Sequence, residues 1–338
     1  MKTETVAATL LRDKQAAAIR HAVELLRSGE VVAVPTETVY GLAADALNPV
    51  AVAKIFEAKA RPFFDPLIVH LPGEEWLERV AQIDNRSRSR IEKLISRFWP
   101  GPLTLVLARQ SIVPDIVTAG LDTVAVRMSS HPVFAQIVSA FAKPLAAPSA
   151  NRFGRISPTT AQHVCDELHG RISLIVDAGP TRHGIESTII AVNDNQIRIL
   201  RRGPITAEEL SDFGEIDTAI PSQKLSAPGQ MPVHYAPKTP LRLVDNAHSF
   251  ALPENYRVGL LAWNLVSPDA KFAAVRILSE RQELREAAAN LFRYLRELDE
   301  LNYDLIVAER VPSHGLGAAI LDRLERASHD SDIRGRLG

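Results

Sequence analysis

Hydrophobic positions along the chain alternate between short β-branched runs and longer stretches with helical spacing. In residues 14–28 apolar side chains recur at helical spacing, and Gly29 follows as a helix-ending residue. The next run, residues 31–34, is valine and alanine and stops at Pro35, which predicts a short strand. Further strands are predicted at residues 67–71, 103–108, 123–127, 145–147, 174–177, 187–192 and 197–201, with helices between most of them. This alternation predicts an α/β fold.

A polar turn follows the first strand. Thr36, Thr38 and Tyr40 place hydroxyl groups in a turn that is expected to end at Gly41. A helix is predicted from residue 49, because asparagine and proline stand at 48 and 49, where they suit the N-cap and the first helical position. The helix joins this turn to the next predicted strand.

Two cations stand at the end of this helix. Lys59 and Arg61 precede Pro62, which disfavours further helix, so both are expected at the mouth of a loop. A planar guanidinium and a compact ammonium facing a hydroxyl turn suit an anionic ligand. The alternative is a solvated helix end, where Lys and Arg are favoured by the helix dipole.

Two later strands carry polar residues of interest. Thr123 and Arg127 share one face of a predicted strand, which fits either a lined site or a solvated edge strand. His70 lies near the end of another strand, where a lone histidine is more often structural than catalytic. Serine and threonine at 157–160 open the next helix and suit its N-cap.

The length of 338 residues favours two domains. Residues 1–213 form the first predicted domain, and the proline-rich residues 214–240 read as a semi-rigid linker. Residues 241–338 contain predicted strands at 241–244, 258–262, 274–277 and 305–308 and a long helix at 282–301, which predicts a small α/β sandwich. A glycine-rich run at 315–320 mimics a dinucleotide fingerprint but has Ile320 in place of its third small residue, so tight loop packing is preferred there.

Composition limits the class of protein. The net charge of −1 gives no overall nucleic-acid footprint, so any anion site must be local. One cysteine, Cys165, excludes an internal disulfide and a thiolate metal cluster. The N-terminal residues do not resemble a signal peptide, and no apolar run has the length of a membrane span, so a cytoplasmic protein is expected. No Walker loop is present.

The stretch from residue 31 to 71 resembles the signature of the YrdC-like family. It contains the pieces PTETVYGL, KARP and DPLIVH in the family's order and spacing. The second half resembles the longer subfamily less specifically, through SAPGQMPVHYAP and GLGAAILDRLERAS. The resemblance implies a twisted mixed sheet with flanking helices, followed by a smaller, Rossmann-like α/β sandwich domain.

The resemblance also implies an activity. Members of the family are L-threonylcarbamoyladenylate synthases, which convert L-threonine, bicarbonate (or CO2) and ATP to threonylcarbamoyl-AMP and pyrophosphate. Mg2+ would accompany ATP, held mainly by phosphates and water. The product would pass to a tRNA threonylcarbamoyl transferase for the threonylcarbamoyladenosine modification of tRNA. The chain's net charge argues against strong direct binding to tRNA.

The resemblance assigns site residues by their place in the family motifs. Those expected to contact ATP are Arg61, Asp65, Thr123, Ser149, Asn151, Ser157, Arg201 and Tyr235. Those expected to contact threonine are Thr38, His70, Arg127, Ala147 and Ser187. Lys59 and Arg61 would stabilise phosphoryl charge, and Arg127 would hold the substrate carboxylate. Asp65 departs from the pattern, because many members carry Asn there, and Tyr235 is expected on a linker that closes over the nucleotide.

The sequence leaves two alternatives to this activity open. YrdC-like domains also resemble RNA-binding modules, which would use a basic concave sheet. A hydrolase or carbamoyl-transfer domain on the same fold is the other. Relatives that embed this domain in carbamoyltransferases carry paired zinc-finger cysteines and longer chains, and this sequence has a single cysteine.

Overall fold

A computed structural model describes the chain except for residues 1, 9–11, 194–195, 218–234, 266–270 and 335–338. The chain divides into two compact units. The first comprises Met1–Phe153, Pro158–Arg182 and Glu186–Gln230, and the second comprises Gly154–Ser157, His183–Ile185 and Met231–Gly338. Residues 154–157 and 183–185 therefore belong to the second unit, although the chain on either side of each segment belongs to the first.

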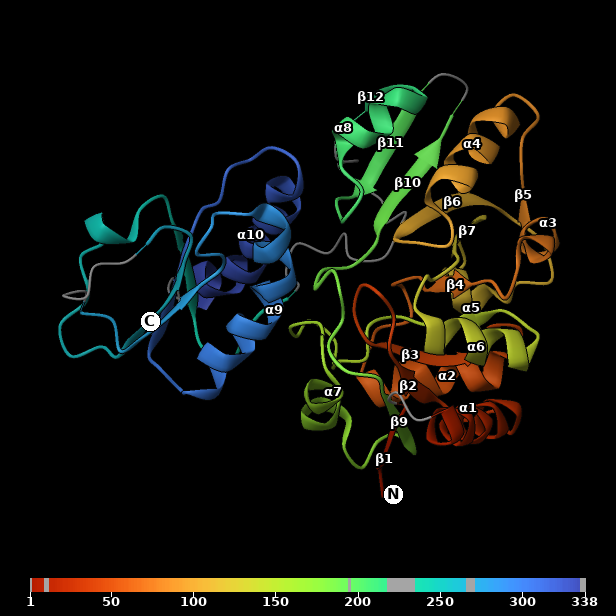
Figure 1. Cartoon of the computed structure of the whole chain (residues 1–338), viewed down its shortest axis with the longest axis horizontal. Helices are drawn as coiled ribbons and strands as arrows, with labels where there is room; N and C mark the ends of the chain where they lie inside the picture. Colours follow the sequence, from red (N-terminus) through yellow and green to blue (C-terminus); the bar gives the residue numbers. More distant parts are fainter. Residues whose placement is uncertain (1, 9–11, 194–195, 218–234, 266–270, 335–338) are drawn as a thin grey trace. The chain divides into compact units, whose positions relative to one another are not determined.

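A mixed sheet forms the centre of the first unit (Figure 1). Its strands are β1 (Glu4–Ala7), β2 (Val32–Val34), β3 (Gly41–Asp45), β4 (Ile68–His70), β5 (Ala81–Gln82), β6 (Leu103–Arg109), β7 (Thr123–Arg127), β8 (Leu145–Ala146), β9 (Leu174–Asp177), β10 (Thr188–Val192), β11 (Gln196–Arg201) and β12 (Glu215–Asp217). Their order is β1-β9-β2-β3-β8-β4-β7-β6-β10-β11-β12, and β5 pairs with β6. Parallel pairs such as β4 with β7 occur beside antiparallel pairs such as β2 with β3. The predicted mixed sheet is confirmed.

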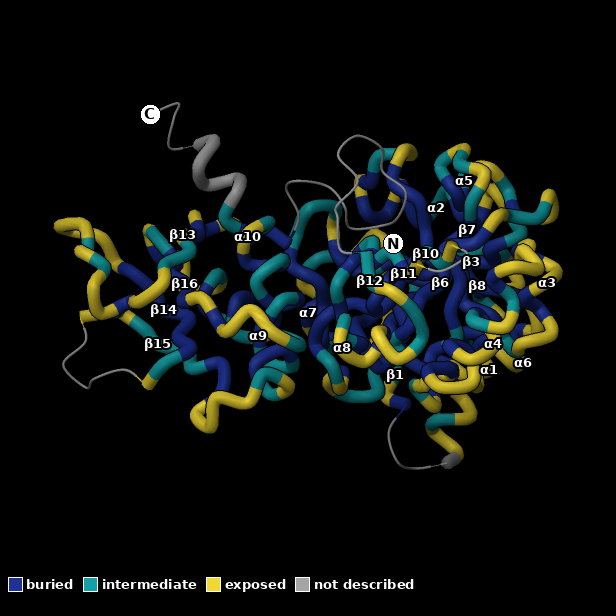
Figure 2. Tube along the Cα trace, turned by 90° about the horizontal axis from the view of Figure 1, so that it is seen from above, coloured by how far each residue is buried: buried dark blue, intermediate teal, exposed yellow. Residues whose placement is uncertain are grey.

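Helices cover both faces of this sheet. They are α1 (Arg12–Arg27), α2 (Pro49–Lys59), α3 (Leu77–Val80), α4 (Arg88–Phe98), α5 (Asp115–Thr118), α6 (Pro132–Phe141), α7 (Ala161–Leu168) and α8 (Ala207–Leu210), with 3-10 turns η1 (Glu74–Trp76) and η2 (Ser211–Phe213). Val32 and Val34 share a core with α1 and α6, whereas Val31 and Ala33 share one with α2, α4 and α7. The alternation along this strand thus separates two hydrophobic cores. Figure 2 shows the buried strands and the exposed outer residues of α3 and α4.

Local signals explain where most helices begin. The side chain of Asn48 accepts hydrogen bonds from the backbone of Val50 (3.0 Å) and Ala51 (3.3 Å), which confirms the predicted N-cap of α2. Thr160 caps α7 in the same way. Ser87 stands at the N-cap position of α4, where its side chain makes no capping hydrogen bond.

Several strands were not predicted. β3 extends the polar turn into a hairpin with β2, and all five of its residues are buried. β12 pairs with β11, although residues 215–217 lie in the stretch that is predicted to be a linker. β1 joins the sheet edge beside β9.

The second unit contains a four-stranded parallel sheet in the order β13-β16-β14-β15. The strands are β13 (Leu241–Val244), β14 (Val258–Ala262), β15 (Ala274–Ile277) and β16 (Leu305–Glu309), accompanied by η3 (Ala247–Ser249), α9 (Leu284–Glu300) and α10 (Leu316–Arg334). This confirms the predicted small α/β domain. Within the described residues, no helix combines the length and the apolar content needed to cross a membrane.

Candidate active site

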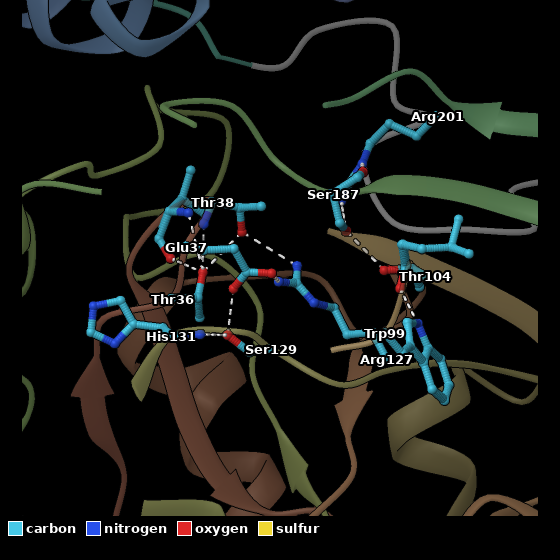
Figure 3. Close-up of polar contacts among 12 residues, drawn as sticks. Thr36, Glu37, Thr38, Trp99, Thr104, Arg127, Ser129, His131, Ser187 and Arg201 are labelled. Carbon is cyan, nitrogen blue, oxygen red and sulfur yellow. Dashed lines mark hydrogen bonds and ion pairs between the residues drawn. The ribbon is translucent and has the colours of Figure 1, made fainter. Parts of the chain in front are cut away.

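The turn between β2 and β3 is organised by Thr36. Its Oγ1 accepts hydrogen bonds from the backbone N–H groups of Thr38 and Val39, both at 3.2 Å, and donates to the carbonyl of Val39 at 2.6 Å. Threonine hydroxyls stabilise turns in this way. The turn therefore holds Glu37 and Thr38 in a fixed geometry (Figure 3).

Arg127 ends β7 beside this turn. Its Nη1 donates to Thr38 Oγ1 at 3.3 Å, and its Nη2 lies 2.5 Å from Glu37 Oε1. Ser129 donates to the other oxygen of Glu37. Arg127 and Glu37 are both buried. Burial lowers the pKa of Arg127, and the charge of Glu37 opposes that shift.

His70 lies opposite Arg127 in the pairing of β4 with β7. Its ring meets the Phe134 ring edge-on at 4.8 Å between centroids. Burial, followed by the charge of Arg127, holds the pKa of His70 well below its ordinary value of 6.5, and the backbone of Ala147 partly opposes this. The imidazole is therefore neutral near pH 7. The structure thus brings together four of the residues that were expected to contact L-threonine, each from a separate segment: Thr38, His70, Arg127 and Ala147.

Lys59 is buried at the end of α2, with 1% of its surface exposed. Its Nζ donates to the carbonyl oxygens of Ser149 at 2.6 Å and Asn151 at 2.5 Å. Burial, then the charge of Arg61, lowers the pKa of Lys59 well below its ordinary value. The alternative of a solvated helix end was wrong, because the loop after β8 covers this cation.

Arg61 is also buried, rather than at an open loop mouth. Its Nη2 lies 2.8 Å from Asp65 Oδ2 and donates to the carbonyl of Pro66 at 2.9 Å. The pKa of Asp65 is raised above its ordinary value, because the effect of burial exceeds the opposing charges of Arg61, Lys59 and Arg201. Asp65 therefore lies among three cations, and its carboxylate pairs with one of them.

A third cation is held beside Ser187. Arg201 Nη2 donates to Ser187 Oγ at 2.9 Å, and Arg201 Nε donates to the Ser187 carbonyl at 3.0 Å. The Ser187 hydroxyl also lies 2.8 Å from the Thr104 hydroxyl on β6 (Figure 3). Two predicted residues thus contact each other directly, because β10 and β11 form a hairpin.

Three residues that were expected to contact ATP are not among the contacts of Lys59, Arg61 and Arg201 described above. Thr123 is half-buried at the start of β7, at the opposite end of the strand from Arg127. Ser157 is buried in the second unit. Tyr235, also in the second unit, is fully buried and stacks on Phe292 with 5.4 Å between ring centroids. The predicted lid lies mostly at residues 218–234, outside the described residues.

Sequence reasoning missed Glu37. This residue stands within the PTETVYGL motif, between two threonines that attracted attention as hydroxyl donors. Its partner Arg127 is 90 positions away. The available signal was the acidic residue itself, in a turn of otherwise apolar and hydroxyl side chains.

Comparison with known proteins gives the family. Residues 24–203 match a family model for Sua5, YciO and YrdC proteins, described as "Telomere recombination". The chain belongs to this Sua5/YrdC family. Residues 205–329 match a second model, described as "Threonylcarbamoyl-AMP synthase, C-terminal domain", which places the chain in the longer subfamily. The resemblance found in the sequence is confirmed.

Relatives of the family match over nearly the full length. A threonylcarbamoyl-AMP synthase of Pyrococcus abyssi is 40% identical over 327 residues, covering 92% of this chain and 94% of the relative. One of Bacillus subtilis is 41% identical over 329 residues, covering 94% of each chain. The crystal structure of P. abyssi Sua5 complexed with L-threonine has a TM-score of 0.86 at 38% identity, covering 97% of this chain and 98% of that one.

Proposed function

We propose that this chain makes L-threonylcarbamoyl-AMP and pyrophosphate from L-threonine, bicarbonate (or CO2) and ATP. Nearly full-length similarity to synthases of this name supports the proposal. The structural observation that carries it is the buried ion pair of Arg61 with Asp65 at 2.8 Å, with two further buried basic side chains, Lys59 and Arg201, near enough to act on the same carboxylate. Several buried cations in one place suit a polyphosphate, whose charge they would neutralise.

Threonine would bind at the turn between β2 and β3. Arg127 offers a planar fork for its carboxylate, with Thr38 and His70 beside it. His70 suits hydrogen bonding and packing better than proton transfer, because burial and Arg127 disfavour its charged form. The amine would therefore lose its proton to bicarbonate or water.

The reaction would have two steps. The threonine amine attacks CO2 and forms a carbamate, releasing one proton. A carbamate oxygen then attacks the α-phosphorus of ATP, and the bond to pyrophosphate breaks. Lys59 and Arg61 would stabilise the charge on the phosphoryl oxygens, so that the protein contributes mainly positioning and electrostatics.

Mg2+ would accompany ATP and neutralise phosphate charge. The described residues contain no cluster of three or more His, Cys, Asp or Glu side chains suited to hold a metal ion. Asp65 is the carboxylate among the three cations, and it pairs with Arg61. These residues fit an ion held mainly by phosphates and water.

The product would serve the threonylcarbamoyladenosine modification of tRNA through a downstream transferase. The RNA-binding alternative gains no support from the site, because Lys59, Arg61 and Arg127 are buried rather than spread over an open surface. Incubation with ATP, threonine and bicarbonate tests the proposal. Pyrophosphate should form only when threonine and bicarbonate are both present, and release at the same rate without threonine would contradict it.

A further inference from the structure

Glu37 is a buried carboxylate that the proposed reaction does not use. It is 4% exposed and lies in the turn that Thr36 organises. One of its oxygens faces Arg127, and the other accepts a hydrogen bond from Ser129 (Figure 3). Ser129 Oγ also accepts from the backbone N–H of His131 at 3.3 Å, which ties this network to the start of α6. Both carboxylate oxygens are therefore engaged, as expected of an anchor.

These contacts fix the orientation of the Arg127 guanidinium. Its two terminal nitrogens are directed to different atoms of one turn, Nη1 to Thr38 and Nη2 to Glu37. Its Nε is buried and has no hydrogen-bond partner among the described residues. Because a guanidinium is planar and has five N–H donors, two anchored nitrogens set its plane and leave N–H groups for a ligand.

We propose that Glu37 is a positioning residue of the threonine site, which acts by holding Arg127 in place for the substrate carboxylate. This inference rests on the proposed function. A buried arginine without a counter-charge is strongly disfavoured, so an empty site needs an internal anion to keep the cation in place. A guanidinium that is ordered before the ligand arrives loses less conformational entropy on binding.

The test measures L-threonine binding by calorimetry in the wild type and in Glu37→Gln. This change keeps the shape of the side chain and removes its charge. Threonine affinity should fall about 10- to 100-fold, the scale of a misplaced charge-assisted contact, while ATP affinity changes less than about twofold. Glu57→Gln, the same change at an exposed position of α2, should leave both affinities unchanged.

A second ligand separates positioning from direct contact. L-Threoninamide lacks the carboxylate, so Glu37→Gln should bind it as well as the wild type does. Equal weakening for threonine and its amide would overturn the inference, because Glu37 would then act on another part of the substrate. Equal threonine affinity in the wild type and a folded Glu37→Gln would also overturn it.

The remaining outcomes are also decisive. If Glu37→Gln fails to fold, Ser129→Ala replaces it, because that change removes one anchor of Glu37 and leaves the ion pair in place. A loss of about three- to tenfold in threonine affinity supports the inference, and an unchanged affinity overturns it. Failure of the wild type itself to bind threonine would count against the proposed function instead.

Discussion

The ammonium group of Lys59 lies 2.6 Å from the carbonyl oxygen of Ser149, although the two residues are 90 positions apart. A second hydrogen bond, to the carbonyl of Asn151, makes the lysine a link between the end of α2 and the loop after β8. The same side chain is therefore both a structural tie and a buried charge. Its protonation should influence both stability and activity.

Lys59→Met should leave a folded protein whose pyrophosphate formation falls about 100-fold, the scale of a lost electrostatic donor. Lys54→Met is the matched control. That lysine lies on the same helix but pairs with Glu30 at 2.7 Å, so the rate should stay close to that of the wild type. A full rate in folded Lys59→Met would show that the cation acts only as a structural tie.

The wild type and Lys59→Met also allow a test of how stability depends on pH. The pKa of Lys59 is lowered in the folded state, so above that pKa the unfolded chain binds a proton that the folded chain has released. The free energy of unfolding of the wild type should therefore rise, relative to Lys59→Met, as the pH increases towards 10.5. Urea denaturation at several pH values measures this difference. A difference that is constant or falls would contradict the lowered pKa.

The sequence predicted the strands rich in β-branched residues but missed others. β3 has the sequence GLAAD, without a valine or isoleucine. It is a buried strand because it pairs with β2 on one side and β8 on the other. β12 was assigned to the linker because three residues carry too little pattern to indicate a strand. Tertiary pairing decided both.

The sequence predicted which residues belong to the site, but it did not predict their burial or their contacts. Motif positions indicated Lys59 and Arg61, but local sequence placed them at a loop mouth. Their burial depends on Ser149, Asn151 and Asp65, which come from other segments or lie beyond the helix end. No periodicity in a sequence reports such long-range contacts.

Asp65→Asn should bind ATP more tightly. The wild-type carboxylate lies among cations that we assign to the phosphates, and removing its charge frees Arg61 to pair with them. A gain of about three- to tenfold is expected from the loss of one like-charge repulsion. Isothermal calorimetry measures it, with Asp84→Asn at an exposed position as the control. Weaker ATP binding would show that the carboxylate contacts the nucleotide favourably.

His70 should make the protein sensitive to acid. Its folded-state pKa is well below 6.5, so the unfolded chain takes up a proton first as the pH falls. The contribution of His70 to stability is complete above 6.5 and is lost as the pH falls below that value towards the lower folded-state pKa. The stability difference between the wild type and His70→Asn should therefore shift against the wild type between pH 7 and pH 5. A stability difference between the two proteins that stays constant from pH 7 to pH 5 would contradict this prediction.

Two variants of Tyr235 distinguish packing of its ring from contact of its hydroxyl with the nucleotide. The ring stacks on Phe292 and lies 5.3 Å from the guanidinium of Arg323, so Tyr235→Ala should destabilise the second unit by about 3–5 kcal/mol. Tyr235→Phe keeps the ring. If the hydroxyl contacts the nucleotide, this variant should raise the KM for ATP and leave the melting temperature nearly unchanged. An unchanged KM would limit Tyr235 to packing.

The proposed synthesis of threonylcarbamoyl-AMP is tested most directly by following the carbon atom of bicarbonate. The chain is incubated with ATP, L-threonine and 13C-bicarbonate, and the nucleotide products are identified by mass spectrometry. The proposed activity predicts threonylcarbamoyl-AMP that carries one 13C atom, together with an equal amount of pyrophosphate. ATP converted to ADP and phosphate at the same rate with or without threonine, and no labelled adenylate, would contradict it.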